Sequence, residues 1–187
     1  MLFGKVAVIT GSCSGLGAEI ARYLSSRGAS VVINYPWESL KPDADDVAKT
    51  LAGPHITVQA DLSTVDGPKH LIKTTAAKFG RIDILVNNAS YAIFKPMEEY
   101  TIEDWEGLVN TNCRGYFLVT QATLPHLSPK NSRIINIVSS DSRFPSPHHA
   151  LYSGSKGMQD SFVRTWSKEL PPKYGCTVNA VSPGPSA

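Results

Sequence analysis

Cysteine is scarce in this chain of 187 residues: there are three, at positions 13, 113 and 176, and no two lie close together. An odd number without a close pair argues against a disulfide framework and against a zinc site, so we expect no metal. The 18 basic residues nearly balance the 16 acidic ones and lie scattered, so no surface for nucleic acid or an anionic membrane is expected. No apolar run approaches the ~20 residues of a membrane span, and the first residues lack the regions of a signal peptide. These absences predict a cytoplasmic protein whose partner is a small, nearly uncharged molecule.

Short apolar runs alternate with helix-length amphipathic segments along the whole chain. This rhythm is typical of βαβ units around a parallel sheet, so we expect one doubly wound α/β domain over residues 1–187. The expected strands are residues 5–10, 30–34, 56–60, 83–86, 133–138 and 176–181. The expected helices are residues 15–27, 43–51, 65–79, 102–127 and 151–170, the last of them ended by Pro171-Pro172.

A glycine-rich turn follows the first expected strand and leads directly into the first expected helix. Residues 10–17 read T-G-S-C-S-G-L-G. Glycines let the backbone turn sharply and approach a pyrophosphate, and a helix N-terminus presents free N–H groups and a partial positive charge. The turn therefore predicts a phosphate-binding site, with a ligand-free glycine turn as the alternative. The residues expected to bind are Gly11, Ser12, Ser14, Gly15, Leu16 and Gly17.

Two side chains at the start of the last expected helix have the spacing of a catalytic pair. Tyr152 and Lys156 are four residues apart, so their side chains share one face of the helix. A phenol with an unperturbed pKa near ~10 is a poor proton donor at neutral pH, and a nearby ammonium favours the phenolate. We therefore expect Lys156 to lower the pKa of Tyr152. Ser139 follows the strand 133–138 at the sheet edge where open α/β folds bind ligands, and we expect its hydroxyl to hold a substrate oxygen. Each piece alone also has an ordinary explanation, as a helix-surface pair or a turn residue.

The order of these motifs resembles the short-chain dehydrogenase/reductase family, and the resemblance covers essentially the whole chain. Residues 10–17 match the family's T-G-x-x-x-G-x-G turn, and residues 152–156 match its Y-x-x-x-K pair. Residues 87–90 read N-N-A-S where the family has N-N-A-G, so Ser90 departs from the usual glycine. The resemblance implies a Rossmann fold, a nicotinamide cofactor and hydride transfer to or from a small carbonyl or alcohol substrate of ketone or quinone-like type.

The resemblance also implies a role for individual residues. Ser139 precedes the tyrosine by thirteen residues, as the catalytic serine of the family does, and Asn112 matches an asparagine that holds a water on the proton path. The implied catalytic residues are Asn112, Ser139, Tyr152 and Lys156. The implied cofactor contacts beyond the glycine turn are Asp61 and Leu62 at the adenine, Asn88 and Ala89 on the nicotinamide ribose side, Tyr152 and Lys156, and Pro183-Gly184 against the nicotinamide.

The end of the second expected strand bears on the choice between NADP(H) and NAD(H). Relatives that prefer NAD place an acidic residue there, which binds the ribose 2′-hydroxyl and repels a 2′-phosphate. This chain has Asn34-Tyr35 instead, with amide and hydroxyl donors, so we expect NADP(H) to be preferred over NAD(H). The glycine turn, however, has Ser14 where many NADP-preferring relatives carry a basic residue.

Residues 147–157 resemble fungal members of secondary metabolism that reduce polycyclic aromatic ketones and naphthols, such as trihydroxynaphthalene and versicolorin reductases. The two histidines in this stretch are expected on a loop or at a pocket rim, and the three tryptophans of the chain as packing residues.

Relatives continue past Pro183-Gly184 with a substrate-covering segment and a seventh strand. We therefore expect a C-terminally truncated member whose strand 176–181 forms an open edge. Two functions remain open: a working reductase, and a non-catalytic nucleotide-binding or subunit-association module. The family's helix-bundle contact uses the helices near 102–127 and 151–170, which are both present, so we expect a homo-oligomer.

Overall fold

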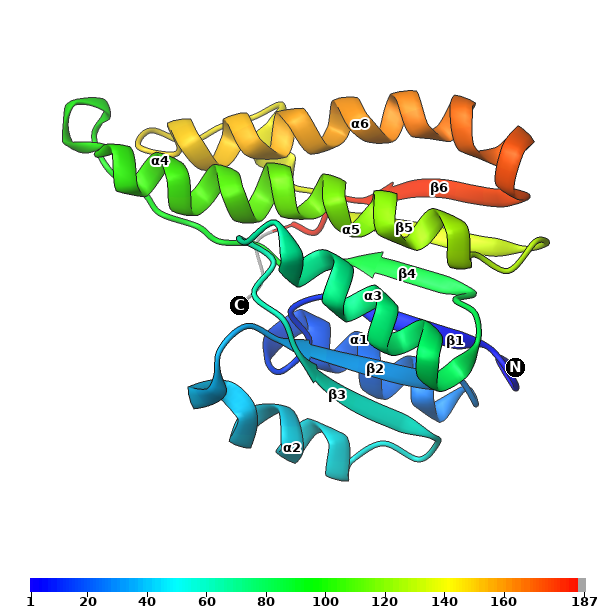
Figure 1. Cartoon of the computed structure of the whole chain (residues 1–187). Coiled ribbons are helices and arrows are strands. Elements are labelled where there is room, and N and C mark those ends of the chain that lie inside the picture. Colours follow the sequence, from blue (N-terminus) through cyan, green and yellow to red (C-terminus); the bar gives the residue numbers. More distant parts are fainter. Residues whose placement is uncertain (185–187) are drawn as a thin grey trace.

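The computed structural model describes residues 1–184 and is built on a six-stranded sheet whose neighbouring strands all run parallel (Figure 1). The strands are β1 (Val6–Ile9), β2 (Ser30–Tyr35), β3 (His55–Gln59), β4 (Ile84–Asn87), β5 (Ser132–Ile137) and β6 (Cys176–Val181). Their order is β3-β2-β1-β4-β5-β6, the Rossmann arrangement, which reverses direction between β1 and β4. The expected fold class is confirmed. Residues 185–187 of the expected domain lie outside the described part.

Helices cover both faces of the sheet (Figure 1). They are α1 (Gly15–Ser26), α2 (Lys41–Lys49), α3 (Asp66–Phe79), α4 (Ile102–Val109), α5 (Tyr116–Thr123) and α6 (Ala150–Tyr174). Ala7 and Ile9 of β1 share an apolar cluster with Ala21 of α1, whereas Val8 between them shares the opposite cluster with Leu71 of α3. Because β1, β2 and β4 are buried on both faces, these strands are almost continuously apolar, which is why they were visible in the sequence.

The helix expected over residues 102–127 is confirmed, since the chain is helical without a break from Ile102 to His126, but it is not α-helical throughout. The helix begins as predicted, because Thr101 and Asp104 form a capping box. After α4, however, the chain widens into a π-helical turn (Asn110–Gly115), continues as α5 and ends in a short 3-10 turn (Leu124–His126). Single π-helical turns often mark functional positions, and this one contains the buried Asn112.

The expectation that Pro171-Pro172 ends the last helix is wrong, because α6 runs past both prolines to Tyr174. The helix is capped by Gly175, whose φ angle is 61°. A proline lacks the N–H that would bond the carbonyl four residues earlier. Here those carbonyls belong to Ser167 and Lys168, two exposed residues on the outer side of the helix. The N–H of Gly175 still donates to the carbonyl oxygen of Pro171 at 3.0 Å, which closes the last turn.

Within residues 1–184, no helix has the length and apolar character that a membrane crossing requires. The same residues contain no group of three or more His, Cys, Asp or Glu side chains placed to hold a metal ion. The three cysteines are free and buried.

Candidate functional site

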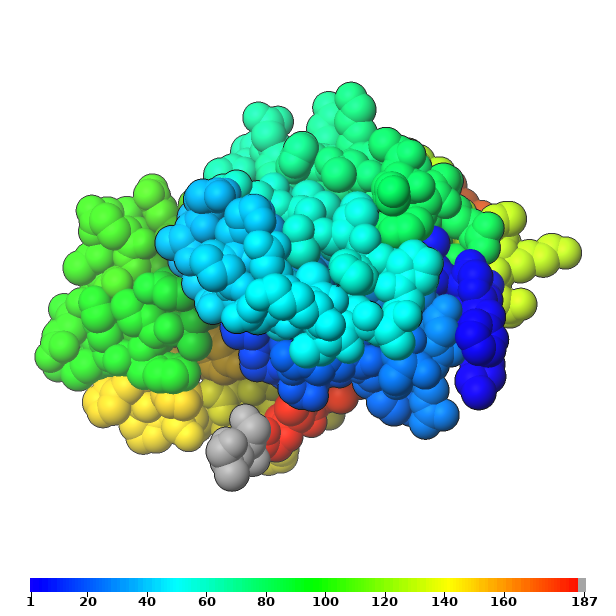
Figure 2. Space-filling view, turned by 90° about the horizontal axis from the view of Figure 1, so that it is seen from below, coloured from blue at the N-terminus to red at the C-terminus, as the bar shows by residue number. Residues whose placement is uncertain are grey.

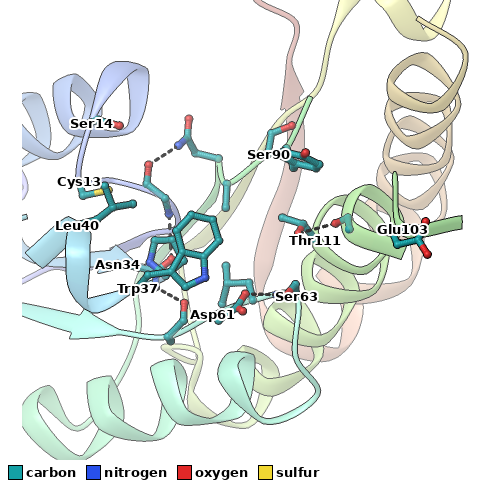
Figure 3. Close-up of a pocket in the computed structure, with 18 residues that line it drawn as sticks. Cys13, Ser14, Asn34, Trp37, Leu40, Asp61, Ser63, Ser90, Glu103 and Thr111 are labelled. Carbon is teal, nitrogen blue, oxygen red and sulfur yellow. Dashed lines mark hydrogen bonds between the residues drawn. The ribbon is translucent and has the colours of Figure 1, made fainter. Parts of the chain in front are cut away.

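A cavity of about 670 Å³ lies at the carboxyl ends of β1, β2, β3 and β4, where the strand order reverses (Figure 3). Open parallel sheets bind their ligands at this place. In Figure 3, Asn34, Trp37 and Asp61 lie together on one side of the cavity, and Ser90 and Thr111 lie on the other. Figure 2 shows the same division on the surface, where the green segment with α4 lies apart from the cyan segments of α2 and β3. The two walls therefore come from different parts of the chain.

The glycine turn between β1 and α1 forms part of the wall through Gly11 and Ser14. Gly11 and Gly15 have positive φ angles of 59° and 54°, which favour glycine. A Cβ on Gly15 would meet nothing within 4 Å, so the backbone at the N-terminus of α1 is open to a ligand. A Cβ on Gly17, in contrast, would lie 2.5 Å from the carbonyl oxygen of Gly11 and 2.6 Å from Nδ2 of Asn88. Gly17 therefore serves the packing of the turn itself.

Asn34 is buried, and both ends of its side-chain amide are bonded inside the protein. Its Oδ1 accepts the N–H of Gly11 at 3.0 Å, and its Nδ2 donates to the carbonyl oxygen of Ala60 at 3.0 Å. Ser12 is bonded in a similar way, because its Oγ donates to the carbonyl oxygen of Ile9 and accepts the N–H of Asn34. Although Asn34 lines the cavity, its amide nitrogen is already bonded in this structure and is not a free donor for a 2′-phosphate. The amide instead ties the glycine turn to the end of β3.

Four of the residues expected to contact the cofactor after β3 and β4 line the cavity: Asp61, Leu62, Asn88 and Ala89. Asp61 is held in a local turn, where its Oδ1 accepts the N–H of Ser63 at 2.9 Å. Asn88 is held to the glycine turn, because its Nδ2 donates to the carbonyl oxygens of Thr10 at 2.9 Å and Gly11 at 3.1 Å. These bonds fix both polar side chains to the ends of their strands.

Other expected cofactor residues lie away from the cavity wall. Tyr35 is buried in the apolar cluster between the sheet and α1, and this burial raises the pKa of its phenol. Leu16 is exposed at the start of α1 and does not line the cavity. Pro183 and Gly184 follow β6, whose last residues pair with β5 directly before Ser139, so they share an edge of the sheet with the catalytic candidates.

The structure brings Ser139, Tyr152 and Lys156 together, although none of the three lines the cavity itself. Ser139 follows β5 and begins a short turn, where its Oγ accepts the N–H of Asp141 at 3.2 Å. Tyr152 and Lys156 lie in the first turns of α6, with Nζ of Lys156 5.6 Å from the centre of the tyrosine ring. Nζ also donates to the carbonyl oxygen of Ile137 in β5 at 3.0 Å, which fixes the buried ammonium between helix and sheet.

The pKa values of this pair differ in part from the expectation. Burial lowers the pKa of Lys156 to about 8, so the ammonium is still the main form at neutral pH. Burial raises the pKa of Tyr152; the hydroxyl of Ser139 acts in the opposite direction, and the Asp141 carboxylate raises the pKa further. The expected lowering of the Tyr152 pKa by Lys156 is therefore wrong for this structure. The ammonium lies over the ring instead of beside the hydroxyl.

Asn112 links the cavity to α6 from the π-helical turn. Its Oδ1 accepts the N–H of Tyr91 at 2.7 Å, and its Nδ2 donates to the carbonyl oxygen of Tyr91 at 2.8 Å and to Oγ of Ser155 at 3.0 Å. Tyr91 itself lines the cavity. The motif correctly brought Asn112 next to the catalytic helix, but it gave no sign that the side chain holds the loop after β4.

An acidic residue, a histidine and an aromatic side chain near Tyr152 were missed as site residues. Nδ1 of His149 lies 2.5 Å from Oδ2 of Asp141. The His149 ring stacks on Phe94 with ring centres 4.0 Å apart, and Phe94 meets the Tyr152 ring edge-on at 5.6 Å. The available signal was spacing, because Asp141 and His149 flank the serine and the tyrosine in the sequence. The rim position expected for the histidines agrees with this geometry.

The three tryptophans do not share one role, contrary to the expectation. Trp166 is buried in an aromatic stack with Tyr116 and Phe162. Trp37 lines the cavity and remains 59% exposed, and Trp105 is 52% exposed on α4. Trp37 follows β2 directly and shares the cavity wall with Asp61, so it is a site residue that the default assignment to packing overlooked.

A parallel sheet in this order, with a glycine turn at the point of reversal, is the architecture of dinucleotide-binding enzymes. Residues 5–187 match the short chain dehydrogenase family, and the chain belongs to this family of oxidoreductases. It is 38% identical over 183 residues to the hydroxynaphthalene reductase arp2 of Aspergillus fumigatus, a match that covers 97% of this chain and 66% of the relative. It is 41% identical over 186 residues to a 3-oxoacyl-(acyl-carrier-protein) reductase of Synechocystis, covering 98% of this chain and 74% of the relative.

Solved structures give the same assignment. A short chain dehydrogenase from Burkholderia cenocepacia in complex with NADP superimposes with a TM-score of 0.91 at 33% identity, covering 98% of this chain and 75% of that chain. A blue fluorescent protein from a metagenomic library in complex with NADPH superimposes with a TM-score of 0.89 at 32% identity, with the same coverage of 98% and 75%. The chain thus spans about two thirds to three quarters of the length of the proteins it matches.

Proposed function

We propose that this chain is an NADP(H)-dependent oxidoreductase that moves a hydride between the nicotinamide and a small ketone, alcohol or quinone-like molecule. The observation that carries the proposal is the cluster of Ser139, Tyr152 and Lys156, together with the cavity at the sheet reversal. Each member has a distinct chemical use there. Asn112 joins this cluster to the cavity wall through Tyr91.

The residues around the cavity have the chemistry that a dinucleotide requires. The open space at Gly15, at the N-terminus of a 12-residue helix, suits a pyrophosphate that accepts backbone N–H groups. We assign the adenine to Asp61 and Leu62, which line the cavity, and Ser14 and Trp37 line it as well. Asn88 and Ala89 then take the nicotinamide ribose side, together with Lys156, and Pro183-Gly184 complete that end.

The chemistry follows from the three side chains. A reduced nicotinamide, when bound, supplies the hydride. Negative charge then builds on the carbonyl oxygen of the substrate, and the hydroxyl of Tyr152 gives that oxygen a proton. The hydroxyl of Ser139 orients the same oxygen, and the Lys156 ammonium holds the ribose hydroxyls. In the reverse direction, Tyr152 takes the proton back from the alcohol.

We further propose that NADP(H) is preferred over NAD(H). Neither of the last two residues of β2, Asn34 and Tyr35, is acidic, so no carboxylate at this position opposes a 2′-phosphate. The two solved relatives described above were crystallised with NADP and NADPH, which supports the same choice. Because the Asn34 amide is already bonded, we assign the 2′-phosphate contacts to the segment after β2, where Trp37 borders the cavity.

Two steps test the proposed function. NADPH and NADH are first titrated into the protein and followed by nicotinamide and tryptophan fluorescence, and a panel of cyclic ketones and quinones is then added. We expect tighter binding of NADPH and its oxidation by some members of the panel. Binding without turnover would favour the alternative of a nucleotide-binding module, and the absence of binding would contradict the proposal altogether.

The assembly and location are proposals of the same kind. Apolar side chains are exposed on α4, α5 and α6: Ile102, Trp105, Phe117 and Met158. We propose that a second copy covers them in a homo-oligomer, and sedimentation equilibrium checks this, since a monomer at micromolar concentration would contradict it. The three unpaired cysteines fit the reducing cytoplasm, where we place the protein.

A further inference from the structure

Gln159 is a buried amide on α6, one turn after Lys156, and the proposed chemistry has not used it. Its side chain is only 1% exposed. Oε1 accepts a hydrogen bond from Nζ of Lys156 at 3.2 Å, and Nε2 donates to the carbonyl oxygen of Asn112 at 2.7 Å. A buried amide is costly unless both of its ends find partners, and here both partners belong to the proposed site.

The chemistry of the two partners determines which way the amide faces. An ammonium has only donors and a backbone carbonyl only accepts, so the reversed amide would place donor against donor and acceptor against acceptor. Three residues along a helix bring Gln159 to the same side as Lys156. The ammonium has a second acceptor in the carbonyl oxygen of Ile137, so two of its three N–H groups are held by the protein and one serves a ligand.

We propose that Gln159 is a positioning residue that holds the Lys156 ammonium by bridging it to the backbone of the π-helical turn at Asn112. The proposal rests on the proposed function, in which Lys156 binds the ribose. A carboxamide accepts at its oxygen and donates at its nitrogen without titrating. It therefore fixes the ammonium without competing for its proton. An apolar side chain would leave the ammonium with one protein acceptor and the Asn112 carbonyl without its partner.

The other groups around the ammonium make its titration a sensitive readout. Burial lowers the pKa of Lys156 to about 8, and the Cys113 thiol in the π-helical turn acts in the opposite direction. Tyr152 faces the ammonium from α6, and Asp141 lies beyond the phenol in the loop after β5. Within residues 1–184, no carboxylate makes a salt bridge to Nζ. The carbonyl oxygen of Ile137 and the amide oxygen of Gln159 are the two acceptors that contact the charged form.

The first test measures the pKa of Lys156 directly by NMR, in protein labelled on the lysine side chains, with Lys156→Arg used to assign the resonance. Gln159→Met keeps the volume and removes the acceptor, so the pKa should fall by about one unit. Gln159→Glu places a carboxylate beside the ammonium, so the pKa should rise above that of the wild type. Gln121→Met removes an exposed glutamine on α5 as the control and should leave the pKa unchanged.

The second test uses NADPH itself as the probe. At neutral pH, Gln159→Met should bind NADPH about tenfold more weakly than the wild type, because the ammonium is no longer held in place. Gln159→Glu should retain more of the affinity than Gln159→Met. A merely structural role predicts something else: both variants would lose thermal stability, with the same Lys156 pKa as the wild type.

The results separate this inference from the proposed function. A pKa order of Met below Gln below Glu supports the role of Gln159, even if NADPH does not bind. A Lys156 pKa that is the same in all three proteins would overturn it, even if NADPH binds well. If Gln159→Met fails to fold, Gln159→Glu alone decides, because the proposal requires its pKa to rise. Failure of the wild type to bind NADPH would count against the proposed function.

Discussion

A single buried amide, that of Asn34, connects the glycine turn to the end of β3. Its two bonds, to the N–H of Gly11 and the carbonyl oxygen of Ala60, need an acceptor at one atom and a donor at the other. Only a carboxamide provides both. This residue therefore bears on the shape of the cavity more than on direct recognition of a ribose.

Asn34→Asp tests this role. The carboxylate keeps the acceptor for Gly11 and loses the donor for Ala60, which leaves a buried carbonyl facing a negative charge. We expect the free energy of unfolding to fall by about 2 kcal/mol, measured by urea denaturation. Asn131→Asp, at an exposed position, should change it little. An Asn34→Asp protein as stable as the wild type, with its preference moved to NADH, would show that the side chain faces the ribose after all.

Sequence motifs predicted residue positions better than residue contacts. Spacing predicted Ser139, Tyr152 and Lys156, and the family resemblance added Asn112. The structure brings these positions together, because the end of a strand and the start of a helix meet at the same edge of the sheet. The bonds of Asn112 to Tyr91 and the stacking of His149 on Phe94 depend on two loops that meet only in the folded chain. Trp37 was missed for the same reason, since the residues around a tryptophan in the sequence do not tell whether it lines a cavity or packs in the core.

Among the elements, α1 and the turn before it depend on two glycines for different reasons. Gly15 needs a left-handed backbone and faces open space, whereas Gly17 lies against the carbonyl of Gly11 and the amide of Asn88. Their substitutions by alanine should therefore have different effects.

Gly17→Ala should displace the turn and abolish NADPH binding, together with a marked loss of thermal stability. The added Cβ of Gly15→Ala meets no atom, so only the positive φ should lower the free energy of unfolding, by about 1 kcal/mol. A loss of NADPH affinity beyond this effect would report contact between the Cβ and the ligand. Thermal melting and NADPH titration of both variants provide the comparison. Equal melting temperatures for the two would show that the close approach at Gly17 does not constrain the turn.

Element boundaries in the sequence were clear where turn chemistry was strong. Thr101 with Asp104 marked the start of α4 correctly, because a capping box is a local signal. The π-helical turn after α4 has no such signal, since it accompanies the tertiary contacts of Asn112. The prolines of α6 misled for a related reason: the residues whose carbonyls lose an N–H partner, Ser167 and Lys168, lie on the exposed side of the helix, which the local sequence does not reveal.

At the scale of the whole molecule, a buried carboxylate joins β1 to β4 at the amino ends of the strands, on the side of the sheet away from the cavity. Asp83, directly before β4, accepts the N–H of Val6 in β1 at 3.0 Å and hydrogen bonds from Lys5 at 2.8 Å and Arg81 at 3.1 Å. Burial alone would raise the pKa of Asp83, but these three bonds outweigh it and the pKa is lowered. The carboxylate thus ties the first strand to the centre of the sheet.

Asp83→Asn should reduce the free energy of unfolding by about 2 kcal/mol at neutral pH, because a charged acceptor of three donors is lost. Since the pKa of Asp83 is lower in the folded than in the unfolded protein, its contribution to stability is fully present above the unfolded pKa of about 4. It disappears as the pH falls through the lower folded value. Urea denaturation between pH 3 and 7 measures it, with Asp46→Asn, from an exposed ion pair with Lys49, as the matched control near zero. A constant difference between Asp83→Asn and wild type across this range would contradict the assignment.

The doubly wound parallel sheet also followed from the sequence, because alternating strands and helices allow few topologies once crossovers are right-handed. The unbroken apolar run of β1 indicates that this strand is buried on both faces. No sequence pattern indicates that the site divides into a cavity and a separate cluster of catalytic candidates. That division arises from the way α4, α5 and α6 lie beyond the reversal of the sheet (Figure 1).

The most direct test of the account is the effect of Tyr152→Phe on the NADPH-dependent reduction of a cyclic ketone or quinone found to be turned over by the wild type. Removal of the proton donor should lower kcat by ~10²–10⁴-fold while NADPH binding changes little, because the ring and its packing against Phe94 remain. Tyr23→Phe, on the exposed side of α1, should leave both quantities as they are. A Tyr152→Phe protein that reduced the same substrate as fast as the wild type would contradict the central claim.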